Sequence, residues 1–406
     1  MPSPDDCVIE VATLEQRYAA SEGARPDFAP HATPEEYRKW YDRKLKAEFA
    51  QNGRWIGWVL IQRRTSGPVL SYLETVRRDG WSKDDEGKVE MTSMYGVVYV
   101  FTPPANRKHG YATRLLRQLH YVLAGTQGAL PPWPEAWGAL PDLPSTLNLP
   151  PSCLSYLSSA APLGFYERAY IGPDENHRLG WEERRTTENA FVRGKLDGVN
   201  TSATFGDSGY TAVDIYYGEM LSLASEMSKV EQSALERTTI PPGTTAFRVD
   251  PTSEGTLAFI KPHLPLGCDR FPERDTSTWV HGVRLIPSGQ SPRPYHATDP
   301  ICLFIPHGFK DGELLITYLD GWDERLVKPL LAYLREVGRK MDPPCDMVWA
   351  WGLDETAGFV QAVCEMGGKY GYRGDKAHRF CPAGVAWYGD AQAKGRLDGL
   401  QAWAWL

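Results

Sequence analysis

The sequence lacks the close cysteine and histidine spacings that hold a metal ion or a disulfide framework. Its seven cysteines are scattered over 406 residues and never form a C-x-x-C pair, and none of its nine histidines belongs to an H-E-x-x-H motif. Zinc sites depend on such spacings, and small disulfide-rich domains depend on dense, even-numbered cysteines. We therefore expect the reduced thiols of an intracellular protein, and no metal site.

Long apolar runs and an excess of basic residues are missing as well. No apolar stretch reaches the ~18 residues that span a membrane, and the first residues lack the basic and apolar regions of a secretory signal. With 44 Lys and Arg against 51 Asp and Glu, the net charge is −7. Because nucleic acids and anionic membranes select basic surfaces, neither is an expected partner. The prediction is a cytoplasmic protein; the sequence carries no indication of oligomeric state.

What the sequence does contain is enough apolar material for more than one domain. Hydrophobic residues make up 42% of the chain and charged residues 23%, as in ordinary globular proteins, and the length suggests two or three domains. The turn Pro241–Gly243 is the best candidate for a boundary. We expect a first domain over 1–211, a linker helix over 212–243 and a C-terminal α/β domain over 244–406.

Hydrophobic periodicity and turn residues predict alternating strands and helices in both halves. In the first half the expected strands are 7–11, 55–62, 69–76, 95–102 and 154–158, and the expected helices are 14–21, 33–50, 111–124 and one that starts at Pro162. After a polar stretch over 172–211 come a long helix, about 212–237, the strands 244–249, 278–285, 301–305, 314–318, 347–351 and 384–388, and the helices 324–340 and 355–366.

Two local features stand out in the first half. Thr33, Pro34 and Glu36 form the pattern of a helix start, with an N-cap threonine, a proline at the first helical position and a glutamate that closes a capping box. Residues 128–153 are dense in Pro and Leu and too long for an ordinary connection. That stretch is either a functional loop or a solvated surface insertion.

The segment that carries chemistry lies over residues 97–116, where a β-forming run meets an amphipathic helix through a short loop. The first turn of a helix offers unpaired N–H groups and the positive end of the helix dipole, which together attract an anion. Gly110 and Ala112 let the backbone approach a pyrophosphate closely, so we expect the N–H groups of Lys108 to Thr113 to bind it. The loop is neither a G-x-G-x-x-G turn nor a P-loop, which disfavours nicotinamide and nucleoside triphosphates.

The pattern Arg107-x-x-Gly110-x-Ala112, between that strand and that helix, resembles the acetyl-CoA loop of the GCN5-related N-acetyltransferases (GNAT). The run from Leu154 to Ile171, which contains Phe165-Tyr166-Glu-Arg, is similar to a later strand and helix of the same superfamily. The resemblance implies the α/β GNAT fold, a mixed and mostly antiparallel twisted sheet flanked by helices. A second mixed α/β domain follows, of which a degenerate GNAT-like unit is one interpretation.

Within the superfamily, the chain is most similar to the fungal lysine N6-acetyltransferases of lysine catabolism. The segments that carry this likeness are 72–78, 100–112, 349–354 and 384–390. The likeness implies acetyl-CoA as co-substrate and the N6-amine of L-lysine as acceptor, attacked directly in a ternary complex. The sequence departs from that family at 158–164, where a more acidic stretch is expected, and in the proline-rich stretch.

The resemblance also implies roles for individual residues. Tyr166 would protonate the leaving CoA thiolate, and Glu74 is the candidate base, with pairing to Arg77 or Arg78 as its ordinary structural alternative. Glu90 is a weaker candidate base, and His109 contributes its backbone N–H rather than its imidazole. The residues implied in cofactor binding are Phe101, Thr102, Arg107, Lys108, His109, Gly110, Tyr111, Ala112 and Thr113.

Other functions remain open at the level of sequence. The same chemistry could serve another small amine, such as a toxin, an antibiotic or a secondary metabolite, and a non-catalytic acyl-CoA-binding module could keep the fold. The joint presence of the Gly110 loop and Tyr166 favours an enzyme. Asp320, Asp323 and Glu324, like the pair 354–355, could bind a cationic substrate or simply cap helices.

Overall fold

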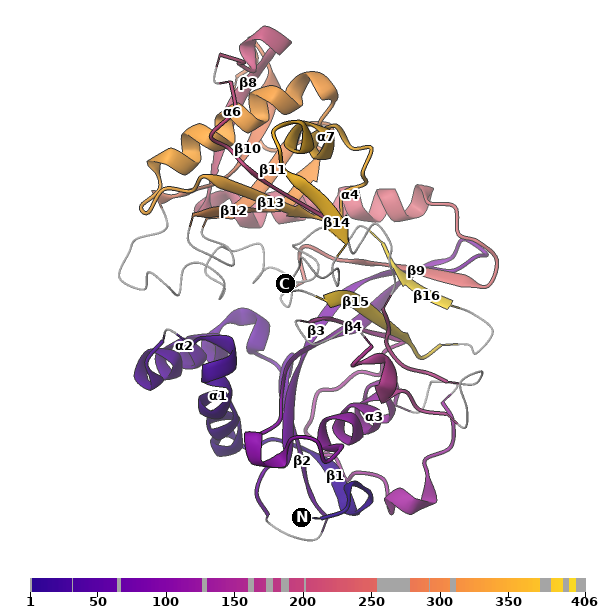
Figure 1. Ribbon diagram of the computed structural model, residues 1–406. Helices are drawn as coiled ribbons and strands as arrows, with labels where there is room; N and C mark the ends of the chain where they lie inside the picture. The colour runs from indigo at the N-terminus through magenta and orange to yellow at the C-terminus, as the bar shows by residue number, and fades with distance from the viewer. Residues whose placement is uncertain are drawn as a thin grey trace. The chain divides into compact units, whose positions relative to one another are not determined.

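The computed structural model describes residues 2–30, 32–63, 67–125, 130–159, 164–172, 178–183, 190–200, 202–253, 278–291, 293–306, 312–372, 381–389 and 394–398 (Figure 1). The chain divides into two compact units. Unit 1 comprises Met1–Arg184, Thr238–Phe247 and Phe380–Leu397, and unit 2 comprises Arg185–Arg237, Arg248–Arg379 and Asp398–Leu406. Neither unit is one continuous stretch of chain.

The sheet of unit 1 is a meander with one parallel step. Its strand order is β1-β2-β3-β4-β5-β15-β6, and β9 pairs with both β3 and β16. The pairs β4–β5 and β9–β16 are parallel, whereas β1–β2, β2–β3, β3–β4, β5–β15 and β6–β15 are antiparallel. The strands are β1 (Cys7–Val11), β2 (Trp55–Gln62), β3 (Ser71–Lys83), β4 (Val89–Phe101), β5 (Leu154–Ser159), β6 (Glu182–Glu183), β9 (Thr244–Val249), β15 (Cys381–Trp387) and β16 (Lys394–Leu397).

Helices pack on both faces of this sheet because its strands alternate apolar side chains between the faces. On β2, Val59 contributes to a core cluster with Ala20 and Ala24 of α1 (Leu14–Phe28), whereas Leu60 contributes to the cluster beneath α3 (Tyr111–Ala124). Figure 1 shows α1 and α2 (Pro34–Lys46) on one side of β2–β4 and α3 on the other.

Helix α2 starts as predicted. The Thr33 hydroxyl accepts the N–H of Glu36, and the Glu36 carboxylate accepts the N–H of Thr33, which completes the capping box. The helix ends at Lys46 rather than at Ala50, because residue 47 is extended and 48–50 form a separate 3-10 turn.

The sheet of unit 2 repeats the parallel step within another mostly antiparallel sheet. Its order is β14-β7-β13-β12-β11-β10-β8, and β12 and β13 are parallel with α6 between them in sequence. Its elements are β7 (Ala190–Lys195), β8 (Tyr210–Tyr216), α4 (Met220–Arg237), β10 (Val280–Pro287), β11 (Ile301–Pro306), β12 (Glu313–Asp320), α6 (Glu324–Lys340), β13 (Met347–Trp351), α7 (Gly358–Glu365) and β14 (Lys369–Tyr372).

The predicted fold class is confirmed, since each unit is a mixed and mostly antiparallel sheet with helices. Several local predictions differ from the structure. Residues 210–216 form a strand rather than the start of the long helix, because they pair with β10 in register. A strand also lies at 190–195 within the stretch that looked unpatterned. Residues 164–166 form a turn that leads into a 3-10 segment, and 160–163 lie outside the described residues.

The two units differ from the predicted ranges 1–211, 212–243 and 244–406 because each sheet includes strands from distant parts of the sequence. The late strand β15 pairs with β5 in unit 1, and β7 from the middle of the chain pairs with β13 in unit 2. Each of these strands covers the edge that the parallel step would otherwise leave open. The sequence shows where a strand begins but not which edge it pairs with.

A buried chain of hydrogen bonds fixes β15 to the core of unit 1. The Trp181 indole donates to Ser155 Oγ (3.1 Å), and the Tyr388 hydroxyl bonds both Ser155 Oγ (2.5 Å) and His120 Nδ1 (3.0 Å). The second ring nitrogen of His120 lies 3.2 Å from the Ala169 carbonyl oxygen. An Nε2-protonated tautomer of His120 satisfies both contacts at once.

None of the described helices is both long enough and apolar enough to cross a membrane. Cys7, Cys153, Cys302, Cys345 and Cys364 are free thiols.

The buried His120 predicts a specific response to acid. Burial lowers the pKa of His120 from 6.5 to about 3, so between these values the unfolded chain binds a proton that the folded protein excludes. The free energy of unfolding therefore falls as the pH drops from 6.5 towards 3, by up to about 1.4 kcal/mol per pH unit. Between pH 7 and pH 4.5, urea titrations should show a loss of unfolding free energy that is roughly 2 to 3 kcal/mol smaller for His120→Asn than for wild type.

The matched control is His296→Asn, since His296 is exposed. It should follow wild type at both pH values. An equal loss of stability for wild type and His120→Asn would contradict a neutral, buried His120.

Candidate active site

The parallel pair β4–β5 opens partway along its length. Cα pairing runs from Met94–Leu154 to Val97–Leu157, while β4 continues to Phe101. Beyond Val97, the side of β4 that faces away from β3 pairs with no described strand. Backbone N–H groups in the middle of a sheet are thereby available to a ligand.

A β-bulge on β4 lies at the same opening. The register between β3 and β4 shifts between Tyr72–Phe101 and Glu74–Val98, so one residue of β3 faces two of β4. Tyr99, inside the bulge, has a φ of 59°, which is uncommon for a residue other than glycine. Non-glycine residues hold such a conformation only where the surrounding structure imposes it, and they cluster at functional sites.

The loop after β4 leads directly into the uncapped start of α3. Gly110 occupies the N-cap position in the left-handed region (φ 81°) and Lys108 also has a positive φ (66°). No side chain caps the helix, and its first turn contains no acidic residue. The N–H groups of the first turn, Tyr111 to Thr113, therefore keep their capacity to bind an anion.

The loop leaves room for such an anion. A Cβ built on Gly110 meets only Pro4 Cγ, at 3.7 Å, so the glycine is required by its φ and not by crowding from the protein. Residues 107–110 are exposed. This is the space that a pyrophosphate would need at the helix start.

The predicted cofactor residues divide by what their side chains do. Arg107 braces the loop: its Nε donates to the Thr102 carbonyl (3.0 Å) and its Nη2 pairs with Asp27 (2.7 Å). Tyr111 is buried, with its hydroxyl on the Pro2 carbonyl (2.8 Å) and its ring beside that of His109. These contacts fit a role for the backbone of the loop in anion binding, with side chains that hold its shape.

Thr102 and Phe101 secure the end of β4. The Thr102 hydroxyl lies 2.9 Å from Ser71 Oγ, and the Phe101 ring is buried against α1 at Gly23. Both side chains face the protein, so their contribution to the site is the position of the strand end.

The equivalent helix start in unit 2 is closed to anions. α6 follows β12 as α3 follows β4, but the Asp323 carboxylate caps it by accepting the N–H of Arg325 (2.9 Å), and Glu324 adds a second negative charge. An anion there would face two carboxylates in place of free N–H groups. The Asp323 side chain therefore caps α6, and the start of this helix lacks the uncapped first turn found at the start of α3.

Glu74 is fully buried on β3 and faces α1 and α2. Its Oε1 accepts the hydroxyls of Tyr41 (2.5 Å) and Tyr72 (2.6 Å) and lies 4.0 Å from Arg17 Nη2, while its Oε2 has no hydrogen-bond partner. The expected alternative, an ion pair with Arg77 or Arg78, is wrong. Those side chains follow on the same strand, and the partner comes from α1 instead.

The Glu74 carboxylate shapes the protonation of its neighbours. Burial, reinforced by the charge of Glu74, raises the pKa of Tyr41 and of Tyr72, so both phenols stay protonated at any ordinary pH. Burial lowers the pKa of Arg17, but Glu74 and the two tyrosines more than compensate, and the net shift is upward. Arg17 is therefore a fixed cation beside the carboxylate.

Tyr166 lies on the opposite face. It is buried in the cluster beneath α3, with its ring edge-to-face to Trp181 (6.2 Å) and Phe165 (5.0 Å). Leu73, which precedes Glu74 on β3, belongs to the same cluster. Because neighbouring residues of a strand face opposite sides of a sheet, Glu74 and Tyr166 lie on different faces. Glu90, the weaker candidate base, is exposed at the far end of β4 and pairs with Lys88.

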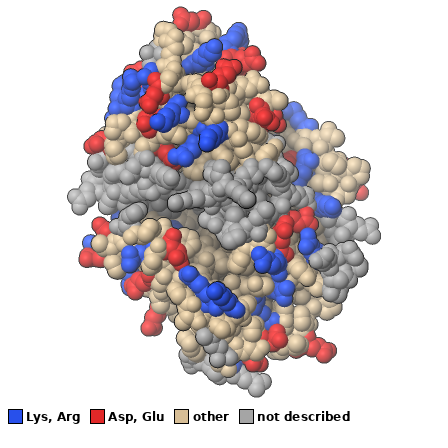
Figure 2. Space-filling model, in the orientation of Figure 1, with Lys and Arg blue, Asp and Glu red and all other residues tan. Residues whose placement is uncertain are grey.

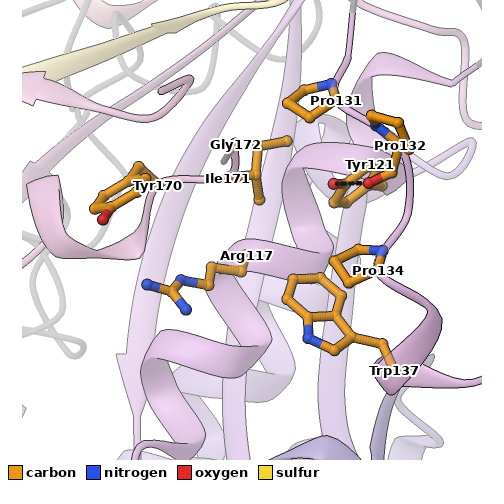
Figure 3. Close-up of a pocket in the computed structure, with 9 residues that line it drawn as sticks. All are labelled: Arg117, Tyr121, Pro131, Pro132, Pro134, Trp137, Tyr170, Ile171 and Gly172. Atoms are coloured by element: carbon orange, nitrogen blue, oxygen red, sulfur yellow. Dashed lines mark hydrogen bonds between the residues drawn. The ribbon is translucent and has the colours of Figure 1, made fainter. Parts of the chain in front are cut away.

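The proline-rich stretch packs against α3 where it is described. The Tyr121 hydroxyl donates to the Pro132 carbonyl (3.1 Å), and Trp137 is buried with its ring beneath the Arg114 guanidinium (3.8 Å). A cavity of about 440 Å³ lies between α3, this stretch and residues 170–172. Figure 3 shows the Tyr121 ring beside the prolines, and Arg117 and Tyr170 on the other side. Residues 130–153 are therefore not a freely solvated insertion.

No continuous patch of one charge marks the face in Figure 2, where Lys and Arg alternate with Asp and Glu over the described surface. Among the described residues, no three His, Cys, Asp or Glu side chains gather as a metal site would require.

Comparison with known proteins yields similarity of structure only. No protein-family model matches the sequence, and no curated protein matches it. A GCN5-related N-acetyltransferase from Kribbella flavida is similar at 14% identity over 94% of this chain and 72% of that one, with a TM-score of 0.48. One from Anabaena variabilis is similar at 11% over 93% and 72%, with a TM-score of 0.47.

A third similar structure is a tandem GNAT protein from the clavulanic acid biosynthesis pathway, at 10% identity over 95% of this chain and 99% of that one, with a TM-score of 0.45. At these identities the likeness concerns the path of the chain and not any side chain of the site.

The open helix start predicts a selective effect of a side chain at Gly110. Gly110→Val should weaken binding of acetyl-CoA, the ligand that the sequence resemblance implies, at least tenfold in calorimetry, because the new side chain occupies the space above the first-turn N–H groups. The protein should still fold, since nothing but Pro4 lies within 4 Å of the new Cβ.

Gly87→Val is the matched control. Gly87 also has a positive φ (88°) with open space around it, but it lies in the β3–β4 turn. Both variants carry the same backbone strain, of about 1 kcal/mol or more. Equal acetyl-CoA affinity in the two variants would contradict an anion site at the start of α3.

Proposed function

We propose that this protein is an acetyl-CoA-dependent N-acetyltransferase of the GNAT superfamily that acetylates the amine of a small molecule. The observation that carries the proposal is the uncapped start of α3, opened by Gly110 and placed immediately after β4, where β4 separates from β5. A pyrophosphate on the helix start would direct the rest of an acyl-CoA towards the opening between the strands. Acetyl-CoA supplies an activated acetyl group as a thioester.

The residues around the opening suit direct transfer in a ternary complex. The backbone N–H groups of β4 beyond Val97, where the pairing with β5 has ended, would stabilise negative charge on the thioester oxygen as the amine attacks. The amine nitrogen forms the new bond to the carbonyl carbon, and the carbon–sulfur bond breaks. Tyr166, from the α3 face, gives its proton to the departing thiolate.

The amine must lose protons in the course of the reaction. A lysine N6-amine is mostly protonated at neutral pH, because its ordinary pKa is about 10.4. Glu74 is the proposed acceptor of a proton, directly through its unpartnered Oε2 or by way of the hydroxyls of Tyr41 and Tyr72. Glu74 lies on the α1–α2 face, so the residue that takes a proton from the amine is on the other side of the sheet from Tyr166, which gives a proton to the thiolate.

The acceptor we favour is the N6-amine of L-lysine. This finer proposal is supported by the sequence resemblance over residues 72–78 and 100–112. A screen of free lysine beside other small amines, followed by release of CoA, tests it. Turnover of another amine in place of lysine would move the proposal to that acceptor, and absence of turnover with every amine would favour a non-catalytic acyl-CoA-binding module.

Tyr166→Phe tests the proton donor. The variant keeps the ring that packs against Trp181 and Phe165 and removes one hydroxyl, so stability and acetyl-CoA affinity should stay near wild type. The turnover number should fall about 10²–10⁴-fold, the usual contribution of general acid catalysis. A variant with full turnover between pH 6 and pH 10 would exclude Tyr166 from the reaction.

Glu74→Gln tests the base. At pH 7 the value of kcat/KM should fall about 10²–10⁴-fold, and the deficit should shrink towards pH 10, where the amine loses its proton without help. Glu90→Gln, on an exposed carboxylate of β4, should behave as wild type. A deficit of the same size at every pH would instead mean that Glu74 only holds Arg17 and the tyrosines in place.

A further inference from the structure

Three aromatic rings surround the ammonium group of Lys44. Its Nζ lies 4.2 Å from the ring centre of Trp40, 4.9 Å from that of Trp55 and 5.8 Å from that of Tyr99. The three rings come from α2, β2 and β4, and we refer to Trp40, Trp55 and Tyr99 as the ammonium cage. A cation close to one ring is common on protein surfaces, whereas several rings around one cation form the kind of cage by which proteins recognise quaternary ammonium ligands, and the same ring faces attract a primary ammonium.

The cage is held in shape by contacts that do not involve Lys44. Trp55 is buried against Phe49 (5.4 Å between ring centres) and Tyr41 (5.5 Å). A binding site whose walls are fixed beforehand loses little entropy when a ligand enters.

Tyr99 and Trp40 are fixed in the same way. Tyr99 stacks on Phe28 (4.6 Å), its hydroxyl bonds that of Tyr37, and its backbone is set by the β4 bulge. Trp40 packs on the Tyr37 ring (4.8 Å). Lys44, by contrast, reaches the cage from the last turns of α2 on a flexible four-carbon stem and is only partly buried.

The cage adjoins the proposed reaction centre. Tyr99 lies in the bulge of β4, just past Val97 where β4 parts from β5, and its ring meets that of Tyr72 edge-to-face (6.2 Å). The Tyr72 hydroxyl donates to Glu74. An ammonium group in the cage is therefore on the same face of the sheet as the carboxylate proposed to take its proton.

We propose that the ammonium cage is the acceptor subsite for a primary alkylammonium, and that Lys44 occupies it in the free protein as an internal surrogate that the substrate displaces. That the bound ammonium is the group to be acetylated rests on the proposed function. The affinity of the cage for an alkylammonium does not depend on it. Glu74, with its unpartnered Oε2, and Arg17, whose guanidinium lies 4.8 Å from the ring centre of Trp55, flank the cage.

The test removes the surrogate and measures binding without acetyl-CoA. Lys44→Ala empties the cage, and NMR titration should show n-butylammonium binding at least tenfold more tightly than to wild type. n-Butanol, which has the same apolar chain and no charge, should gain less than twofold. Lys39→Ala, an exposed lysine on the same helix, should behave as wild type.

Two further variants keep the result interpretable. Lys44→Gln retains most of the side chain without its charge, so it should bind the probe between wild type and Lys44→Ala and guards against a folding defect in the latter. Trp40→Leu combined with Lys44→Ala should lose the gain. Equal affinity of wild type and both Lys44 variants for n-butylammonium, or an equal gain for n-butanol, would overturn the proposal.

The outcome is independent of acetyl transfer. If the cage binds the probe but the protein has no acetyltransferase activity, the proposed function is contradicted and the ammonium site still stands. If the enzyme is active but Lys44→Ala shows neither a gain in probe affinity nor a lower KM for the amine, the ammonium cage is contradicted and the proposed function still stands.

Discussion

The structure of unit 1 depends on one short parallel pairing, β4 with β5, which holds over Met94–Val97 and then ends. The parallel direction requires a crossover, and that crossover supplies α3 with its uncapped start. The end of the pairing leaves backbone groups unpaired in the middle of the sheet, where an elongated ligand can lie between two strands. The proposed anion site and the proposed oxyanion site would both follow from this single feature.

The two faces of the sheet provide different chemical environments at this opening. On the α1–α2 face, Glu74 and Arg17 are buried among tyrosine hydroxyls, so charge is tolerated there because each ion is close to its counterion. On the α3 face, the Tyr166 ring packs edge-to-face against the rings of Phe165 and Trp181. A sheet that separates a charged side from an apolar one would keep the proposed proton acceptor, Glu74, apart from the proposed proton donor, Tyr166.

Local features of the site could be predicted from the sequence, and those made by distant contacts could not. The Gly110 turn and the Thr33 capping box depend on neighbouring residues, and both are found as expected. The partners of Glu74 come from α1 and α2, and the rings around Lys44 come from three elements. Residues 210–216 show the limit most clearly: their strand exists because β10 pairs with them, and no local pattern distinguishes it from a helix.

The late position of β15 also bears on how the chain folds as it is synthesised. The bond between His120 and Tyr388 joins residues 268 positions apart, and β7 must wait for β13 to be made before it can pair. Until residues near 350 have left the ribosome, β7 lacks its partner β13, and until residues near 390 have left it, the edge of β5 that β15 will cover stays open. Contacts this distant slow folding and leave strand edges exposed to other chains. The nascent protein should therefore need a chaperone more than its size alone would suggest.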